Sequence, residues 1–193
     1  NTLALLIVAG VAMLSWSAAL VIDARVAQDA ARRSLALVST PRASVSPRDV
    51  IGAVTLAPPR PIVARGSPIA ELLIPRVHLS SIVLHGSDTQ TLRRGPGHLE
   101  QTALPGEPGN VAIAGHRDTF FRPLRDVRRG DDVFLVTPQQ RLHYKVTSLH
   151  VVHPRDLSVL EPTEQATLTL ITCYPFSVFG NAPDRFVVRA TRV

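Results

Sequence analysis

The feature that most constrains the fold is a series of short apolar runs that begins at Ile69 and continues to the end of the chain. Clusters of Gly, Pro, Asn and Asp separate the runs, as at 95–97 and 108–110. The runs are AELLIP, SIVLHG, NVAIAGH, DDVFLV, LHYKVTSLHVV, ATLTLITC and RFVVRA. Short strands bounded by turn residues are typical of an all-β barrel or sandwich, so we expect residues 69–193 to form one such domain.

One segment inside this domain has a different period. Phe120, Phe121, Leu124 and Val127 recur at helical spacing, which predicts a short helical turn within 119–127.

A long apolar run precedes the domain. Residues 3–22 carry no charged side chain, and about 20 apolar residues suffice to cross a bilayer as a helix. Trp16 lies near one end, where an amphipathic ring suits the membrane interface. A signal peptide is the competing interpretation, because 17–19 reads Ser-Ala-Ala, a small-residue cleavage pattern. We expect residues 1–22 to form a transmembrane anchor.

The segment between the apolar run and the barrel is expected to be a spacer at 23–68. Its first part, 23–37, has the pattern of a short amphipathic helix, and 40–68 is rich in Pro, Arg and Ser. We expect residues 1–66 to contribute nothing to the core, so that a chain lacking them folds and stays active. Three arginines follow the run: Arg25, Arg32 and Arg33. They do not fix the orientation of the run by the positive-inside rule, because that rule compares both flanks and the given sequence has only two residues before the run.

The net charge limits which classes of binding partner are expected. The formal net charge is +6, and Lys145 is the only lysine, so arginine supplies nearly all of the positive charge. The arginines are scattered, and no zinc-finger, helix-turn-helix or RNA-binding signature accompanies them, so we expect no nucleic-acid partner. Attraction to anionic lipid or to a cell-wall polymer is the better use of this charge.

Three residues at the ends of apolar runs could carry chemistry. His116 ends one run, Cys173 ends another, and Arg185 opens the last. A thiolate can attack a carbonyl, an imidazole can move the protons, and a cation can hold the developing oxyanion. Taken singly, each has a structural alternative: a buried inert cysteine, a structural histidine and a solvated arginine. Together they indicate acyl transfer, with all three expected to meet at one groove.

The surrounding sequence resembles the sortase family, which are cysteine transpeptidases. TLITC at 169–173 matches the family's Thr-Leu-X-Thr-Cys signature, and RFVVRA at 185–190 resembles its last strand. The stretch 95–137, with GHRDTFF, resembles the segment around the family's catalytic histidine, and 74–86 resembles its first paired strands. The details are most similar to class D sortases or to Gram-negative relatives.

This resemblance implies a fold and a mechanism. The fold is a closed, mostly antiparallel barrel of about eight strands with short helical turns, preceded by one transmembrane helix that leaves the catalytic domain outside the cytoplasm. Cys173 would attack an LPXTG-like sorting signal of a substrate protein and form a thioacyl intermediate, and His116 would protonate the leaving amine. The acceptor would be a peptidoglycan cross-bridge amine, a pilin lysine or water. Alternation puts Arg185 and Arg189 on one face, and the resemblance favours Arg185 as the oxyanion cation.

Other classes of protein fit this sequence less well. L,D-transpeptidases keep a His-Gly pair before their cysteine, where this chain has Ile171 and Thr172, and papain-like enzymes place Cys before His. A non-enzymatic surface β-domain would leave Cys173 inert. We expect no cofactor and no metal: Asp118 and Glu107 form no ligand-spaced cluster. The remaining histidines have ordinary structural interpretations; they are His78, His85, His98, His143, His150 and His153.

Overall fold

The computed structural model describes residues 2–38, 63–177 and 180–193. The expected spacer at 40–68 therefore lies mostly outside the described residues. The helices are α1 (Thr2–Val38) and α2 (Thr89–Arg94), with 3-10 turns η1 (Pro75–Val77), η2 (Arg122–Asp126) and η3 (Ser158–Leu160). The strands are β1 (Pro68–Ile74), β2 (Leu79–His85), β3 (Gly97–His98), β4 (Asn110–Ala114), β5 (Asp132–Val136), β6 (Arg141–Val152), β7 (Thr167–Tyr174) and β8 (Asp184–Arg192).

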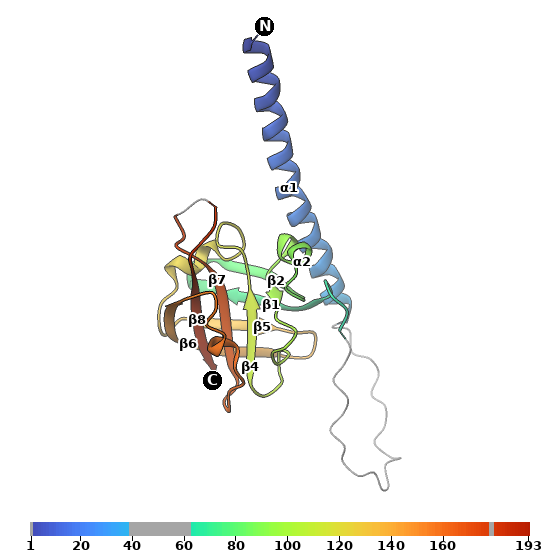
Figure 1. The fold of residues 1–193 in the computed structure, drawn as a ribbon. Coiled ribbons are helices and arrows are strands. Elements are labelled where there is room, and N and C mark those ends of the chain that lie inside the picture. Colours follow the sequence, from blue (N-terminus) through green and yellow to red (C-terminus); the bar gives the residue numbers. More distant parts are fainter. Residues whose placement is uncertain (1, 39–62, 178–179) are drawn as a thin grey trace.

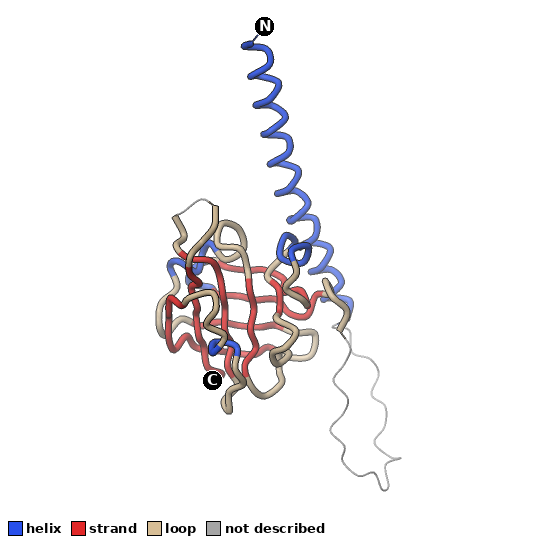
Figure 2. Tube along the Cα trace, in the orientation of Figure 1, coloured by secondary structure: helices blue, strands red, loops and turns tan. Residues whose placement is uncertain are grey.

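Within these ranges, the eight strands close into a barrel in the order β1-β2-β3-β4-β7-β8-β6-β5, with β5 pairing back onto β1. Figure 2 shows the strands, in red, gathered into this barrel beside α1. The pairings β2–β3 and β4–β7 are parallel, and the others are antiparallel. The expected closed barrel is confirmed, and the parallel pair β4–β7 brings the carboxyl ends of two distant strands to the same edge.

Alternation along the strands separates a core face from an outer face. On β7, Leu168 and Leu170 belong to the buried core, so Thr169, Ile171 and Cys173 face outward. The expected turn within 119–127 is the shorter 3-10 turn η2. Three of the four predicted side chains in and around this turn lie in the core: Phe121, Leu124 and Val127.

The helix α1 is one continuous element where two were expected, and its second half packs on the barrel. Leu35 is buried against Ile82 and Leu84 of β2. The amide of Gln28 accepts from the Ile82 N–H at 2.7 Å and donates to the Ile82 carbonyl at 3.0 Å. Arg32 pairs with Glu71 of β1 at 3.0 Å. The expectation that residues 1–66 contribute no core is therefore wrong for this part of the helix.

Gln28 lies where the barrel has its shortest strand. The strand β3 has two residues and pairs only with Leu84 and His85 of β2, so Ile82 is left beyond its reach. The Gln28 amide also donates to the carbonyl of Arg94, at the end of α2, at 2.9 Å. A side-chain amide thus supplies hydrogen bonds that a longer β3 would have made.

The N-terminal half of α1 projects beyond the barrel (Figure 1). Among the residues that the structure describes, no helix is both long and apolar enough for a membrane crossing.

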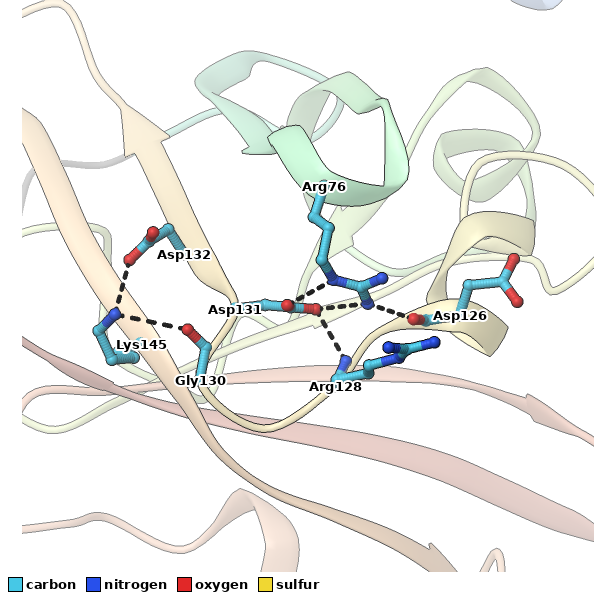
Figure 3. Close-up of polar contacts among 7 residues, drawn as sticks. All are labelled: Arg76, Asp126, Arg128, Gly130, Asp131, Asp132 and Lys145. Atoms are coloured by element: carbon cyan, nitrogen blue, oxygen red, sulfur yellow. Dashed lines mark hydrogen bonds and ion pairs between the residues drawn. The ribbon is translucent and has the colours of Figure 1, made fainter.

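A charged cluster fixes the connection from β4 to β5, which carries His116 at its start. The guanidinium of Arg76 in η1 makes two hydrogen bonds with the carboxylate of Asp131, at 2.5 and 2.7 Å, and also donates to the carbonyl of Asp126 (Figure 3). The carboxylate also accepts the backbone N–H of Arg128 at 2.8 Å. The hydrogen bonds from Arg76 hold the pKa of Asp131 below its ordinary value. The end of the connection is thereby tied to the turn between β1 and β2.

Candidate active site

The parallel pairing of β4 and β7 brings His116 beside Cys173. The register pairs Ala114 of β4 with Ile171 of β7. The residues that follow on the two strands therefore lie at similar heights. The pairing continues past the strand: the Gly115 N–H donates to the Ile171 carbonyl at 3.0 Å, and the buried Thr172 hydroxyl donates to the Gly115 carbonyl at 2.7 Å. The chain therefore stays against β7 until His116, which stands level with Cys173.

The turn after His116 depends on a residue without a side chain. A Cβ at Gly115 would lie 2.8 Å from the ring of Phe121, a fully buried core residue. The Phe121 N–H donates to the His116 carbonyl at 3.0 Å, which closes the turn. His116 itself is exposed. The ring of Phe121 thus anchors the segment beneath an accessible imidazole.

Cys173 lies between the His116 segment and the last strand. It carries a free thiol, is partly buried and sits at an outward position of β7. Its register partner on β8 is Arg185. The segments that carry the three predicted residues thus lie on neighbouring strands of the barrel, in the order His116 after β4, Cys173 on β7 and Arg185 on β8.

The guanidinium of Arg185 is held at the start of β8. Its Nη1 donates to the carbonyl of Asp184 at 2.9 Å and to that of Ala182 at 3.4 Å. Arg189 lies on the same face but pairs with Thr169, four positions from Cys173 along β7, and donates to the carbonyl of Val159. Of the two arginines left open by alternation, Arg185 is therefore the one at the level of the thiol.

Two features beside the site are not predicted by the sequence patterns. Arg117 is buried, and its Nη2 donates to the carbonyl of Gly180 at 2.7 Å, which links the loop after β4 to the β7–β8 connection. Tyr174, Phe176 and Phe186 pack their rings together at the same end of the barrel, with centroids 5.4 to 6.2 Å apart. The adjacency of Arg117 to His116 was the available signal for the first feature.

Two hollows lie away from this site. One of about 480 Å³ is lined by residues that include Arg129, Lys145 and Arg192, and one of about 410 Å³ by residues that include Arg65 and Asp88. Neither is lined by His116, Cys173 or Arg185. In the described part of the chain, no group of three or more His, Cys, Asp or Glu residues is placed to hold a metal ion.

A closed barrel in which neighbouring strands end in a histidine, a cysteine and an arginine fits a cysteine acyltransferase. Comparison with known proteins specifies the class. The family model described as Sortase domain matches residues 72–193. Sortase D of Bacillus subtilis (strain 168) is 33% identical over 135 residues, covering 69% of this chain and 67% of that protein. Sortase A of Listeria monocytogenes is 30% identical over 109 residues, covering 54% of this chain and about half, 49%, of that protein.

Solved structures agree with the sequence comparison. The Clostridium perfringens Sortase D5 transpeptidase superposes with a TM-score of 0.63 at 30% identity, covering 68% of this chain and 82% of that one. Clostridium perfringens sortase C with the C-terminal cell wall sorting motif gives a TM-score of 0.63 at 28% identity, covering 68% and 73%. The chain belongs to the sortase family and is a cysteine transpeptidase. The likeness to the B. subtilis and C. perfringens sortases D agrees with the class D resemblance in the sequence.

Proposed function

We propose that this chain is a membrane-anchored transpeptidase that cleaves an LPXTG-like sorting signal through a thioacyl intermediate on Cys173 and passes the acyl group to an amine, so attaching proteins to the cell surface. The observation that carries the proposal is the position of Cys173, level with His116 on one side and paired with Arg185 on the other.

The chemistry follows from the three groups. The Cys173 thiolate attacks the carbonyl carbon of the scissile bond, a C–S bond forms, and the carbonyl oxygen gains negative charge. As the C–N bond breaks, the imidazolium of His116 gives its proton to the departing amine. An acceptor amine then attacks the thioester, neutral His116 takes a proton from it, and the thiolate leaves. Atoms and protons balance without a cofactor.

Arg185 is the proposed stabiliser of the oxyanion. The Nη1 bonds to the carbonyls of Asp184 and Ala182 hold the guanidinium at the start of β8. A planar cation fixed in this way needs little reorganisation when charge develops on the substrate carbonyl, which is the condition for effective electrostatic stabilisation.

The partners are proposed from the family. The related C. perfringens sortase C was solved with a cell wall sorting motif, which supports a substrate protein bearing such a signal at its C-terminus. The acceptor is an amine, from a peptidoglycan cross-bridge or a pilin lysine, and water resolves the thioester when no amine is present.

We also propose a single-pass location in the cell membrane with the catalytic domain outside the cytoplasm. The uncharged run 3–22 supports the anchor, and the N-terminal half of α1 stands clear of the barrel. The proposed organisation is an anchor at 1–22, a connecting segment at 23–68 whose helical part packs on the barrel, and a catalytic domain at 69–193. Flotation of the full chain with lipid vesicles tests the anchor: a chain that stays at the bottom of the gradient contradicts it.

The activity is tested with an LPXTG-type peptide and an amine acceptor. We expect the full chain to release the C-terminal fragment and to form the peptide–amine conjugate, and Cys173→Ala to do neither. Cleavage that persists in Cys173→Ala would contradict the proposal, as would cleavage without conjugate at every amine tested. Scanning the peptide at each motif position and exchanging the amine would define the signal and the acceptor.

A further inference from the structure

A basic hollow of about 480 Å³ opens on the barrel where β6 and β8 meet the turn that leads into β5. Its lining includes Arg129 of this turn, Lys145 of β6 and Arg192 of β8, and all three residues are exposed. None of the described residues that line the hollow is acidic. Three cations from three chain segments therefore border one concave surface.

The turn that carries Arg129 is held by its backbone. The Gly130 N–H donates to the Val146 carbonyl at 2.8 Å, and the Val146 N–H donates to the Asp131 carbonyl at 2.9 Å. Gly130 has a φ of 88°, in the left-handed region that favours glycine. The Asp131 carboxylate is only 8% exposed and is directed toward Arg76 (Figure 3). This carboxylate is therefore not presented to the hollow beside Arg129.

A β-bulge lies in the floor of the basic hollow. The register between β6 and β8 shifts between Val146 and Ser148, so Thr147 is an extra residue on β6. The Thr147 hydroxyl donates to the Arg189 carbonyl at 3.2 Å. A bulge bends its strand, and the hollow, which Val146 and Thr147 help to line, lies at this bend.

Asp132 offsets part of the positive charge. Its carboxylate pairs with Lys145 at 3.1 Å (Figure 3) and with His143 at 2.8 Å. The hydrogen bonds from His143 and Lys145 hold the pKa of Asp132 below its ordinary value, so this carboxylate is ionised at neutral pH. Within the described part of the chain, neither Arg129 nor Arg192 forms an ion pair. The hollow thus presents two guanidinium charges to a ligand.

The basic hollow lies far from the candidate active site. Val152 of β6 is the register partner of Arg185, and Lys145 lies about 23 Å from that level along the strand, at roughly 3.3 Å per residue. The C-terminus at Val193, which also lines the hollow, lies at the lower side of the barrel in Figure 1, whereas α1 rises above the barrel to the N-terminus. A domain anchored through residues 1–22 would therefore turn this hollow away from the bilayer.

We propose that the basic hollow binds a phosphodiester polymer of the cell wall. This inference rests on the proposed function, because it takes the catalytic domain to lie outside the cytoplasm. The proposed peptide chemistry uses a single arginine, whereas the chain carries a formal net charge of +6, and a polyanion is the partner that complements this charge.

The shape and the donors of the hollow favour a phosphate-bearing chain over other anions. An open hollow leaves a single small anion in contact with water, whereas a polymer with repeated charges gains from several contacts at once. The planar donors of a guanidinium match two oxygens of one phosphate group. The position of the hollow away from the proposed anchor favours a polymer of the wall over the head groups of the membrane.

Binding of a synthetic poly(glycerol phosphate) to the full chain in neutral detergent, measured by isothermal titration calorimetry, tests the proposal. In the double variant Arg129→Gln, Arg192→Gln, we expect Kd to rise about tenfold at low salt, since two exposed charge contacts are lost. The difference should shrink as salt is added, because salt screens exposed charges. The control is the double variant Arg33→Gln, Arg93→Gln, which removes the same charge from exposed positions on α1 and α2. The control should bind within about twofold of the wild type.

Three other anions separate the proposed ligand from its alternatives. Inorganic phosphate and monomeric dihexanoylphosphatidylglycerol, at the same phosphate concentration, should each bind at least about tenfold more weakly, because each offers one charge. Poly-glutamate of similar length should also bind more weakly than the phosphodiester. An equal loss in the control variant would indicate bulk charge, and equal binding of poly-glutamate would indicate any polyanion. Equal binding of the lipid would indicate a head-group site, and each of these three results would overturn the proposal.

Amide hydrogen exchange locates the contact. Exchange at 128–131, 145–147 and 191–193 should slow when the polymer is added to the wild type but not to the double variant of Arg129 and Arg192. Slowing confined to other segments would contradict the site. Without polymer, turnover of an LPXTG-type peptide should be the same in this double variant and the wild type. If the wild type binds the polymer but turns over no peptide, the proposed function fails and the site stands; if it turns over peptide but binds no polymer, only the site fails.

Discussion

Cys173 on β7 and Arg185 on β8 are register partners, and the parallel pair β4–β7 brings His116 level with Cys173 from the other side. The chemical groups come from three chain segments that the barrel topology makes adjacent. The order of the strands, rather than proximity in sequence, thus assembles the candidate site.

The role of Arg185 is tested by Arg185→Lys, which keeps the charge but loses the planar pair of donors. We expect kcat for transpeptidation to fall by about a hundred- to a thousandfold, the usual effect of losing one oxyanion donor. Arg192→Lys is the matched control. Arg189 is unsuitable as a control because it donates to the Val159 carbonyl, so its substitution would disturb a second contact. Near-normal kcat in Arg185→Lys would remove this arginine from the mechanism and leave the oxyanion to backbone amides.

Thr172 links the two strands that present His116 and Cys173. Thr172→Val keeps the shape but removes the hydrogen bond to the Gly115 carbonyl, so a buried carbonyl loses a donor. We expect unfolding free energy to fall by about 1 to 3 kcal/mol and kcat/KM to fall with it, while Thr167→Val at the far end of β7 leaves kcat/KM close to wild type. Equal kcat/KM in Thr172→Val and the wild type would show that this bond does not position His116.

Much of this arrangement could be predicted from the sequence, because the strand-end positions of His116, Cys173 and Arg185 follow from apolar runs and turn residues. The two-residue strand β3 has no such run, so it was missed. The Gln28 contact joins residues 54 positions apart, and local periodicity carries no information about such a partner. Alternation could not separate Arg185 from Arg189, since only the register of β7 against β8 tells which one is level with the thiol.

The second half of α1 should stabilise the barrel. Gln28→Ala leaves the Ile82 N–H and carbonyl without their partner, and we expect the unfolding free energy to fall by about 1 to 3 kcal/mol. A chain that begins at residue 63 should lose more, because Ile82 and Leu84 also lose Leu35, whereas one that begins at residue 24 should keep the wild-type value. Urea unfolding measures all three. The same midpoint for the chains beginning at 24 and 63 would show that the helix only rests on the barrel.

His98 should make the stability depend on pH near neutrality. Burial lowers the pKa of His98 below its ordinary 6.5, while its hydrogen bond to the Ala103 carbonyl opposes the shift. Because the unfolded chain takes up this proton at a higher pH than the folded one, the contribution of His98 is fully present above about pH 6.5 and is lost as the pH falls through the folded pKa.

Unfolding midpoints measured in urea between pH 5 and 7.5 check this dependence. They should fall toward pH 5 in the wild type, and His98→Gln should flatten the curve in this window, whereas the carboxylates with lowered pKa, such as Asp131, act only at lower pH. A wild-type curve that rises toward pH 5, or one that His98→Gln leaves unchanged, would contradict the assignment.

Cys173 is proposed to carry the acyl group of the cleaved peptide. The most direct measurement is intact-protein mass spectrometry after brief mixing with an LPXTG-type peptide in the absence of an amine, followed by peptide mapping of the modified protein. We expect an adduct with the mass of the N-terminal peptide fragment, located on Cys173, sensitive to hydroxylamine and lost on adding the acceptor amine. Rapid cleavage with no adduct on Cys173, or an adduct on any other residue, would contradict it.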